Sequence, residues 1–191
     1  MEPEECPLPS AEPLEDDLKW WAMSAVFNRS LLAASSLDAL GVEHFVPKRY
    51  VVRTVGGKKQ RDLVPAVCNL LFIRTTVSGI RDLKSQLPYL QYLIRREAGR
   101  GYPIIVPTDQ MRDFIRVAET YDDGNLYFTP EELDLCRGRR VRIHGGVLDG
   151  VEGILLKVKG ARDRRVVISL DNVMSVAAAT IHPDLIEILE E

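Results

Sequence analysis

Three histidines and two acidic pairs are the side chains of this 191-residue chain whose types best suit acid–base or metal chemistry. They are His44, His144, His182, Asp122-Asp123 and Glu131-Glu132. The sequence places no convincing nucleophile or paired carboxylate near any of these histidines, and it contains no glycine-rich phosphate loop of the Walker or dinucleotide type. We therefore expect a protein that is not an enzyme and that uses no cofactor or metal. The histidines are then structural or solvent-facing, and the acidic pairs are solvated loop residues.

Composition and cysteine content favour a soluble protein of a reducing compartment. Apolar residues make up 46% of the chain and charged residues 28%, and no apolar run approaches the roughly 20 residues that cross a bilayer. Cys6, Cys68 and Cys136 are too few and too scattered for a disulfide framework or a zinc site. The acidic, proline-rich start does not resemble a signal peptide. We expect a cytoplasmic monomer without membrane contact.

Charge is distributed unevenly along the chain. Residues 1–17 carry seven acids, four prolines and no base, so they cannot bury enough apolar surface to offset chain entropy, and we predict a disordered tail. Residues 136–165 instead carry nine lysines and arginines against three acids. Such a patch can attract a phosphate backbone, but solvated faces of small barrels are often equally basic. Both interpretations remain open from composition.

Strand-like and helix-like segments alternate between the tail and residue 119. The pattern predicts strands at 20–26, 42–46, 68–75, 89–95 and 104–106. It predicts helices at 30–40, at 77–87 and from 108 onward, the last with Met111, Ile115 and Ala118 on one face. A basic hairpin with Gly56-Gly57 at its tip precedes the third strand. This βαββαβ order is that of a ferredoxin-like domain over 18–119, and we expect a linker at 120–135.

Residues 136–191 are predicted to form a second, all-β domain. Val141 and Ile143 alternate with polar residues, as expected for a strand with one buried face. A glycine-punctuated turn joins this strand to an alternating one that ends near Lys159. The segment resembles the KOW motif of transcription elongation factors and ribosomal proteins, whose pattern is met by Gly138, Val141, Ile143, Gly150 and Gly153, with Gly146 near the first turn glycine. Small SH3-like barrels share such turns for structural reasons alone, and that alternative stays open.

The order of the two domains resembles the NusG family of transcription elongation factors. Trp20-Trp21 is similar to the family's opening aromatic strand, and His44-Phe45-Val46-Pro47 to its second strand. Residues 69–74 resemble the third strand, although Leu70 stands where the family usually has tyrosine. The resemblance implies an α+β protein, with a ferredoxin-like NGN domain followed by a small SH3-like KOW β-barrel. The acidic extension and the unusual third strand are most similar to specialised UpxY-type paralogues that act at polysaccharide operons.

The resemblance implies an antiterminator that binds RNA polymerase and reduces pausing and termination. The implied polymerase-binding residues are Ser24, Val67, Leu70, Phe72, Thr76 and Ser78. Alternation places Leu71 and Ile73 on the opposite face from Leu70 and Phe72, so we expect the former pair in the core and the latter pair at the site. Leu70 and Phe72 could instead be core residues. Thr76 and Ser78 are also well placed to cap the helix that follows them.

Two basic groups are the candidates for further partners. The implied contacts to non-template DNA or nascent RNA are Arg53, Lys58, Lys59 and Arg61, and those to a ribosomal protein or termination factor through the KOW domain are Arg140, Arg142, Lys157 and Arg164. The main alternative is a KOW-type RNA-binding protein of translation or ribosome assembly. That alternative requires exposed aromatic residues on the central strands of the first domain, where residues 67–75 offer only Phe72.

Overall fold

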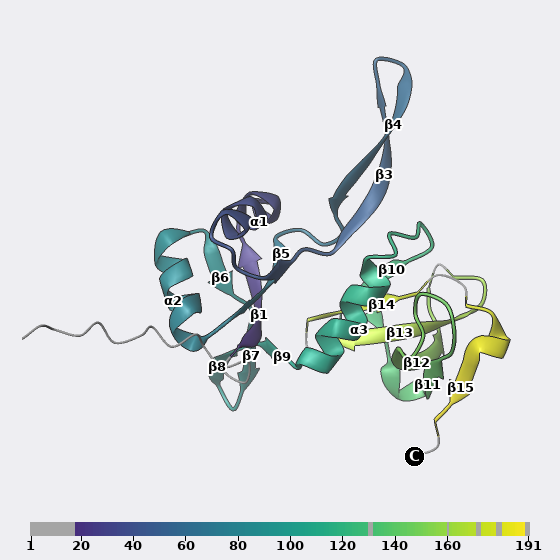
Figure 1. The fold of residues 1–191 in the computed structure, drawn as a ribbon. Helices are drawn as coiled ribbons and strands as arrows, with labels where there is room; N and C mark the ends of the chain where they lie inside the picture. Colours follow the sequence, from purple (N-terminus) through teal and green to yellow (C-terminus); the bar gives the residue numbers. More distant parts are fainter. Residues whose placement is uncertain (1–17, 130–131, 160, 171–172, 179–180, 190–191) are drawn as a thin grey trace, which may run out of the picture.

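The computed structural model describes residues 18–129, 132–159, 161–170, 173–178 and 181–189. The predicted disordered tail, residues 1–17, lies outside the described residues. The chain has a mixed α and β structure with many strands and few helices (Figure 1). None of the described helices is long and apolar enough to span a membrane.

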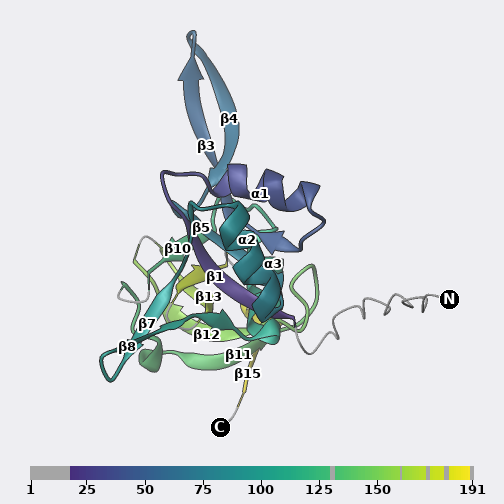
Figure 2. The ribbon, with the colours of Figure 1, turned by 90° about the vertical axis from the view of Figure 1, so that its left-hand side faces the viewer.

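The first sheet contains the strands predicted between residues 20 and 106. It has the antiparallel order β2-β5-β1-β6, with β9 also paired to β1. These strands are β1 (Lys19–Ala25), β2 (His44–Phe45), β5 (Leu70–Thr75), β6 (Leu90–Tyr92) and β9 (Ile105–Val106). Helices α1 (Ser30–Ala39) and α2 (Val77–Gln86) cover one face, as Figure 2 shows, and α3 (Thr108–Ala118) packs on the other. The predicted helices therefore form within one or two residues of the expected bounds.

Alternation along β1 and β5 divides their side chains between two apolar clusters. Trp21, Leu71 and Ile73 pack beneath α1 and α2, which confirms that Leu71 and Ile73 are core residues. Trp20 and Phe72 point to the opposite side and pack with α3. The sheet is therefore buried on both faces, which is consistent with the nearly continuous apolar composition of its two central strands.

Two hairpins lie outside this sheet. β3 (Lys48–Val55) and β4 (Lys58–Pro65) form the predicted basic hairpin, which projects away from the body of the molecule (Figure 1). Gly56 and Gly57 occupy its tip with φ of 58° and 78°, a region that residues with a Cβ enter at a cost. β7 (Ile94–Glu97) and β8 (Arg100–Pro103) form a second hairpin that the sequence did not predict, because we expected one strand through residue 95.

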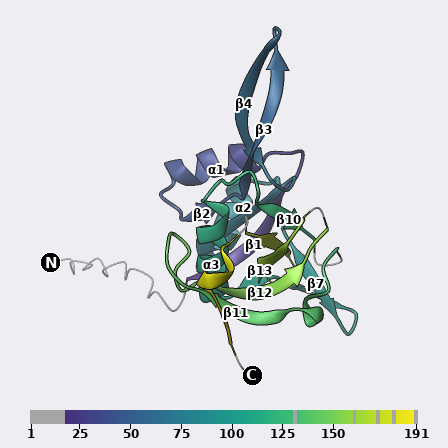
Figure 3. The same ribbon diagram turned by 90° about the vertical axis from the view of Figure 1, so that its right-hand side faces the viewer.

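The second sheet contains six antiparallel strands in the order β10-β14-β13-β12-β11-β15. Figure 3 shows β11, β12 and β13 of this sheet side by side. They are β10 (Leu126–Phe128), β11 (Arg139–Ile143), β12 (Glu152–Lys157), β13 (Arg164–Leu170), β14 (Met174–Ala177) and β15 (Ile186–Ile188). Short 3-10 helices, η3 (Leu135–Arg137) and η4 (Pro183–Leu185), precede β11 and β15. β10 lies inside the segment that we expected to be a linker.

The expected closed barrel is not observed among the described residues. The end strands β10 and β15 do not pair with each other, so the sheet stays open. The physical reason lies in α3, which packs against β13 and β14. Phe114 and Val117 of α3 share one apolar cluster with Val166 and Ile168 of β13. The helix therefore covers apolar surface that a closed barrel would bury against itself.

Two motif glycines of the second sheet allow close packing rather than an unusual backbone conformation. A Cβ on Gly153 would lie 2.7 Å from the carbonyl oxygen of Val167 and 2.8 Å from Cγ1 of Val166. A Cβ on Gly138 would overlap the side chain of Ile154. Gly150 differs, because its φ is 78° and nothing lies near the added Cβ. Gly150 therefore takes the positive φ of a turn glycine, whereas at Gly153 the requirement is space between β12 and β13.

Candidate protein-docking and nucleic-acid surfaces

An apolar hollow of about 190 Å³ opens where the ends of β1 and β5 meet the second sheet. Its walls are formed by Met23, Ser24, Val67, Cys68, Leu70, Leu93 and Val173. Ser24 and Leu70 are cross-strand partners, and Val67 lies just before β5. The fold thus brings together three residues for which the family resemblance implies polymerase binding.

Phe72 does not belong to this hollow. Its side chain is fully buried, and its ring packs against the ring of Phe114 with centroids 6.1 Å apart. Phe45 contacts the same ring of Phe114 from another direction, at 6.2 Å. We expected Phe72 at the surface, but α3 covers it because Phe114 fills the space above β5. Phe72 is therefore a core residue, as the alternative interpretation of the sequence proposed.

Phe114 is the residue of this region that our sequence reasoning missed. We placed Met111, Ile115 and Ala118 on the inner face of the third helix, whereas the buried side chains of α3 are Met111, Phe114, Val117 and Ala118. The signal was present, since Phe114 follows Met111 by three residues and shares its face of the helix. Leu70 is also mostly buried, with 5% of its surface exposed, although it lines the hollow.

Val173 gives the hollow a wall from the second sheet. It precedes β14 and packs against the same apolar cluster as Leu93 and Val67. The contact between the two sheets is extended by Arg116 of α3, whose Nη2 donates hydrogen bonds to the carbonyls of Val147 and Asp149 at 3.0 and 2.8 Å. A partner that enters the hollow therefore touches both sheets.

Thr76 and Ser78 lie at the start of α2 and have a local structural role. The Thr76 Oγ1 accepts a hydrogen bond from the backbone N–H of Gly79 at 3.0 Å, which is the geometry of an N-cap. The hydroxyls of Thr76 and Ser78 are also 3.0 Å apart. The capping role that the sequence allowed is thus formed, and Ser78 is exposed beside the cap.

The projecting hairpin distributes its four predicted nucleic-acid residues over two faces. Cross-strand partners share a face, so the register places Lys59 and Arg61 on one side and Arg53 and Lys58 on the other. Each side carries apolar residues between the cations, such as Val52 beside Arg61. A single phosphate backbone cannot lie flat against all four residues at once.

Arg61 is already engaged by the segment that leads into the second sheet. One guanidinium nitrogen lies 2.7 Å from a carboxylate oxygen of Asp123, and the group lies 3.9 Å from the centroid of the Tyr50 ring. Tyr50 also contacts Tyr121 edge to face at 6.2 Å. Asp123, which we expected to be a solvated linker residue, therefore neutralises one of the predicted nucleic-acid contacts.

Tyr127 of β10 links the second sheet to the base of the same hairpin by a hydrogen bond. Its hydroxyl donates a hydrogen bond to the carbonyl of Lys48 at 3.3 Å. Burial raises the pKa of the Tyr127 hydroxyl to about 12. The group is therefore a neutral donor at physiological pH and acts as a fixed contact between hairpin and sheet.

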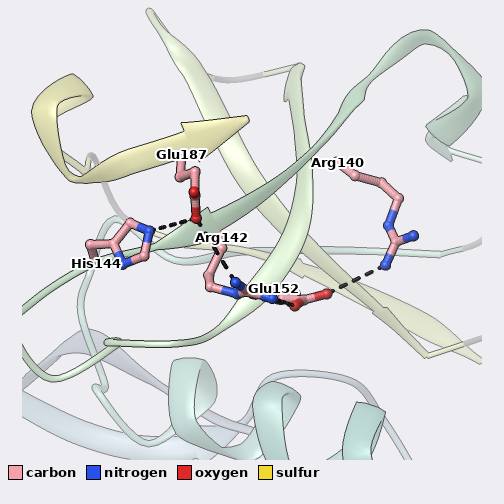
Figure 4. A network of polar contacts seen from close by, with 5 residues as sticks. All are labelled: Arg140, Arg142, His144, Glu152 and Glu187. Atoms are coloured by element: carbon pink, nitrogen blue, oxygen red, sulfur yellow. Dashed lines mark hydrogen bonds and ion pairs between the residues drawn. The ribbon is translucent and has the colours of Figure 1, made fainter. Parts of the chain in front are cut away.

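The cations predicted to bind a partner through the second sheet form two groups. Arg140 and Arg142 both pair with Glu152, at 3.4 and 2.6 Å, and Glu187 joins Arg142 to His144 (Figure 4). The hydrogen bond from Arg142 is the main cause that lowers the pKa of the Glu152 carboxyl, and the same bond raises the pKa of Arg142. These arginines tie β11 to β12 and β15.

Lys157 and Arg164 are cross-strand partners on β12 and β13. The register places them on the opposite face of the sheet from Arg140 and Arg142. They border a groove of about 360 Å³ whose other charged residues are Glu132, Asp134, Arg137 and Lys159. Lys157 also donates a hydrogen bond to the carbonyl of Arg162. The four predicted residues therefore do not form one patch.

Each histidine has a polar contact with a neighbouring group. His44 Nδ1 lies 3.0 Å from the carbonyl of Val42, His144 Nε2 lies 2.8 Å from Glu187, and the His182 ring accepts a hydrogen bond from the backbone N–H of Asp184. These contacts fit the structural roles expected from the sequence. In the part of the chain that the structure describes, no three His, Cys, Asp or Glu side chains are grouped so as to hold a metal ion.

Comparison with solved structures finds proteins of similar fold. No protein-family model matches the chain, and no curated protein matches it. The chain is similar to a solved structure titled "Domain interaction in Thermotoga maritima NusG", with a TM-score of 0.42 and 16% sequence identity. The match covers 92% of this chain and 99% of the other. The functional assignment therefore depends on the residues of this chain.

Proposed function

We propose that this protein is a NusG-like transcription elongation factor that docks on RNA polymerase through its first sheet and reduces pausing and termination without catalysing a reaction. The observation that carries this proposal is the apolar hollow in which Ser24, Val67 and Leu70 meet. Ser24 lies on β1, whereas Val67 lies just before β5 and Leu70 at its start, and the family resemblance implies polymerase binding for all three. The similarity of the third strand and acidic extension to UpxY-type paralogues supports action at particular operons, such as polysaccharide loci.

The arrangement of the first sheet supports an NGN-like domain. The order β2-β5-β1-β6 with antiparallel neighbours is the order expected of a ferredoxin-like βαββαβ chain. In the second sheet, the close approach at Gly138 and Gly153 and the positive φ of Gly150 give physical reasons for the glycines of a KOW motif. The KOW assignment thus agrees with the strand register, although the sheet is open.

The hollow suits an apolar side chain of a protein partner. A cavity of about 190 Å³ has room for one or two side chains of leucine or phenylalanine size, and burying such a group contributes about 1.5–3 kcal/mol. Preferential docking on the active form of the polymerase would lower the population of the paused form. The projecting hairpin would add contacts to DNA or RNA phosphates. The second sheet would recruit a ribosomal protein or a termination factor.

The main alternative, an RNA-binding protein of translation, is less well supported by the first sheet. Base stacking requires exposed aromatic side chains on central strands. Trp20, Trp21 and Phe72 are all buried, so β1 and β5 offer no aromatic stacking surface.

Transcription in vitro across a pause site tests the proposal. Purified polymerase should show shorter pauses and more readthrough in the presence of this protein. Val67→Asp should abolish the effect, because a carboxylate in the hollow opposes apolar docking. Val147→Asp is the matched control, since the Val147 side chain is exposed on the turn before β12. Unchanged pause lifetimes on several templates with the unaltered protein would rule the proposal out.

A further inference from the structure

Phe27 is displayed to solvent in a backbone conformation that bulky residues avoid. Its side chain is 82% exposed, and its φ is 61°. Asn28 follows with φ of 59°, so two successive residues with side chains lie in the left-handed region. Asparagine tolerates this region, but phenylalanine does so at a clear cost. Because the ring is exposed, burial of its apolar surface contributes little stability to offset that cost.

The turn that carries Phe27 is fixed by hydrogen bonds from two neighbouring segments. The backbone N–H of Asn28 donates to Oδ1 of Asn69, and the N–H of Ala25 donates to the carbonyl of the same residue, both at 2.7 Å. The N–H of Val26 donates to the carbonyl of Tyr89 at 3.0 Å. Asn69 itself has φ of 64°. Backbone strain that the surroundings hold in place is a feature of binding and switch sites.

Arg29 gives the Phe27 ring a charged neighbour. Its guanidinium carbon lies 5.6 Å from the Phe27 ring centroid and 5.4 Å from that of Tyr89. Within the described residues, no carboxylate forms an ion pair with Arg29. The cation is thus positioned by two aromatic rings, and its N–H donors remain available to a carboxylate of a partner.

The turn is continuous with the apolar hollow. Asn69, which holds the turn, stands between Cys68 and Leu70, two residues of the hollow's wall. On the other strand, Ala25 follows Ser24 directly and is hydrogen-bonded to Asn69. The same strand ends therefore shape the hollow and present Phe27.

We propose that Phe27 is a specificity-determining residue of the docking surface: its ring enters an apolar recess of the polymerase while Arg29 pairs with an acidic side chain at the rim of that recess. This inference rests on the proposed function, because it takes the polymerase as the partner. The strained turn holds the ring outward before binding, which lowers the conformational cost of docking.

Substitution of Phe27 by glycine tests the effect of the ring on stability and on binding separately. Phe27→Gly relieves the strained φ and should raise the Tm by about 2–4 °C. The same change should weaken equilibrium binding to purified RNA polymerase at least about fivefold, as expected for an aromatic anchor. Asn28→Gly is the matched control, since it adds a glycine to the same turn but keeps the ring, and its affinity should equal that of the unaltered protein. Phe27→Tyr keeps the ring and should bind within about twofold of it.

The outcomes distinguish this inference from the proposed function. Equal affinities of Phe27→Gly and Asn28→Gly, with binding still lost in Val67→Asp, would overturn the role of Phe27 and leave docking through the hollow intact. A fall in Tm for Phe27→Gly would show that the ring stabilises the fold, and would also overturn the inference. Absence of binding by the unaltered protein would overturn both proposals.

Discussion

At the scale of single residues, Phe72 and Val67 differ in burial. Phe72 is fully buried in the core, whereas Val67 is partly exposed and lines the hollow. Alternation along β5 correctly separates the face of Leu71 and Ile73 from that of Leu70 and Phe72. It does not say what covers the second face. That cover is Phe114, which lies more than forty positions further along the chain, so only the tertiary arrangement shows that Phe72 is closed off.

Phe72→Ala should therefore act on stability. Removing a fully buried aromatic side chain leaves a cavity and costs about 3–5 kcal/mol. The free energy of unfolding, measured with urea, should fall by that amount, whereas Val67→Ala at the partly exposed hollow should cost much less. Equal losses for the two variants would contradict the assigned positions.

Gly153→Ala should destabilise the second sheet more than Gly150→Ala. At Gly153 the added Cβ meets the backbone oxygen of Val167, so β12 and β13 must separate. At Gly150 it meets open space, and only the positive φ opposes it, at a cost of about 1 kcal/mol. Thermal unfolding of both variants makes the comparison, and a larger loss at Gly150 would show that the register of β12 and β13 is misassigned.

At the scale of elements, the basic hairpin was predictable from its residues but its two faces were not. The sequence predicts the glycine tip and the cations, since both are local features. Which face of the hairpin each cation occupies depends on the register of β3 with β4. The ion pair of Arg61 with Asp123 depends on a segment about sixty residues further along the chain.

Loss of cations from the hairpin should consequently have unequal effects. Lys58→Gln combined with Lys59→Gln should weaken binding to a DNA duplex and reduce the salt dependence, by roughly one unit of slope for each lost phosphate contact. Arg61→Gln should have a smaller effect per charge, because Asp123 already neutralises that guanidinium. Fluorescence anisotropy over a series of salt concentrations measures both slopes, and a dominant effect of Arg61→Gln would contradict this account.

The ion-pair cluster on β11, β12 and β15 makes the second sheet sensitive to acid. The hydrogen bond from Arg142 lowers the pKa of Glu152, so this carboxyl stabilises the fold above its ordinary pKa. That contribution is lost as the pH falls through the lowered pKa. The difference in urea midpoint between the unaltered protein and Glu152→Gln should be present at pH 7 and vanish in acid. A pH-independent difference would mean that the charge of Glu152 has no part in it.

At the scale of the whole molecule, α3 links the two sheets and decides the shape of the second. The order of strands in the first sheet could be predicted from hydrophobic periodicity and turns. The open second sheet could not, because its apolar face is covered by a helix that belongs to the preceding segment. β10 was missed for a related reason, since its partner β14 lies about fifty residues later and the local sequence is rich in turn residues.

Val173 is the residue next to the second sheet that matters most for the proposed docking, because it lines the hollow together with residues of the first sheet. It contributes a wall of the hollow from the segment before β14, so a partner that enters the hollow contacts it. Val173→Ala removes part of this apolar wall and should weaken binding to RNA polymerase several-fold, whereas Val147→Ala on the exposed turn should leave the affinity unchanged. Equal affinities of Val173→Ala and the unaltered protein would mean that the partner does not reach this wall.

The most direct test of the central claim is the equilibrium affinity of the protein for purified RNA polymerase, measured for the unaltered chain, Val67→Asp and Val147→Asp. The account predicts saturable binding by the unaltered chain and by Val147→Asp, and a loss of at least about tenfold for Val67→Asp with its fold intact. Binding by Val67→Asp that equals that of the unaltered chain would contradict docking through the hollow.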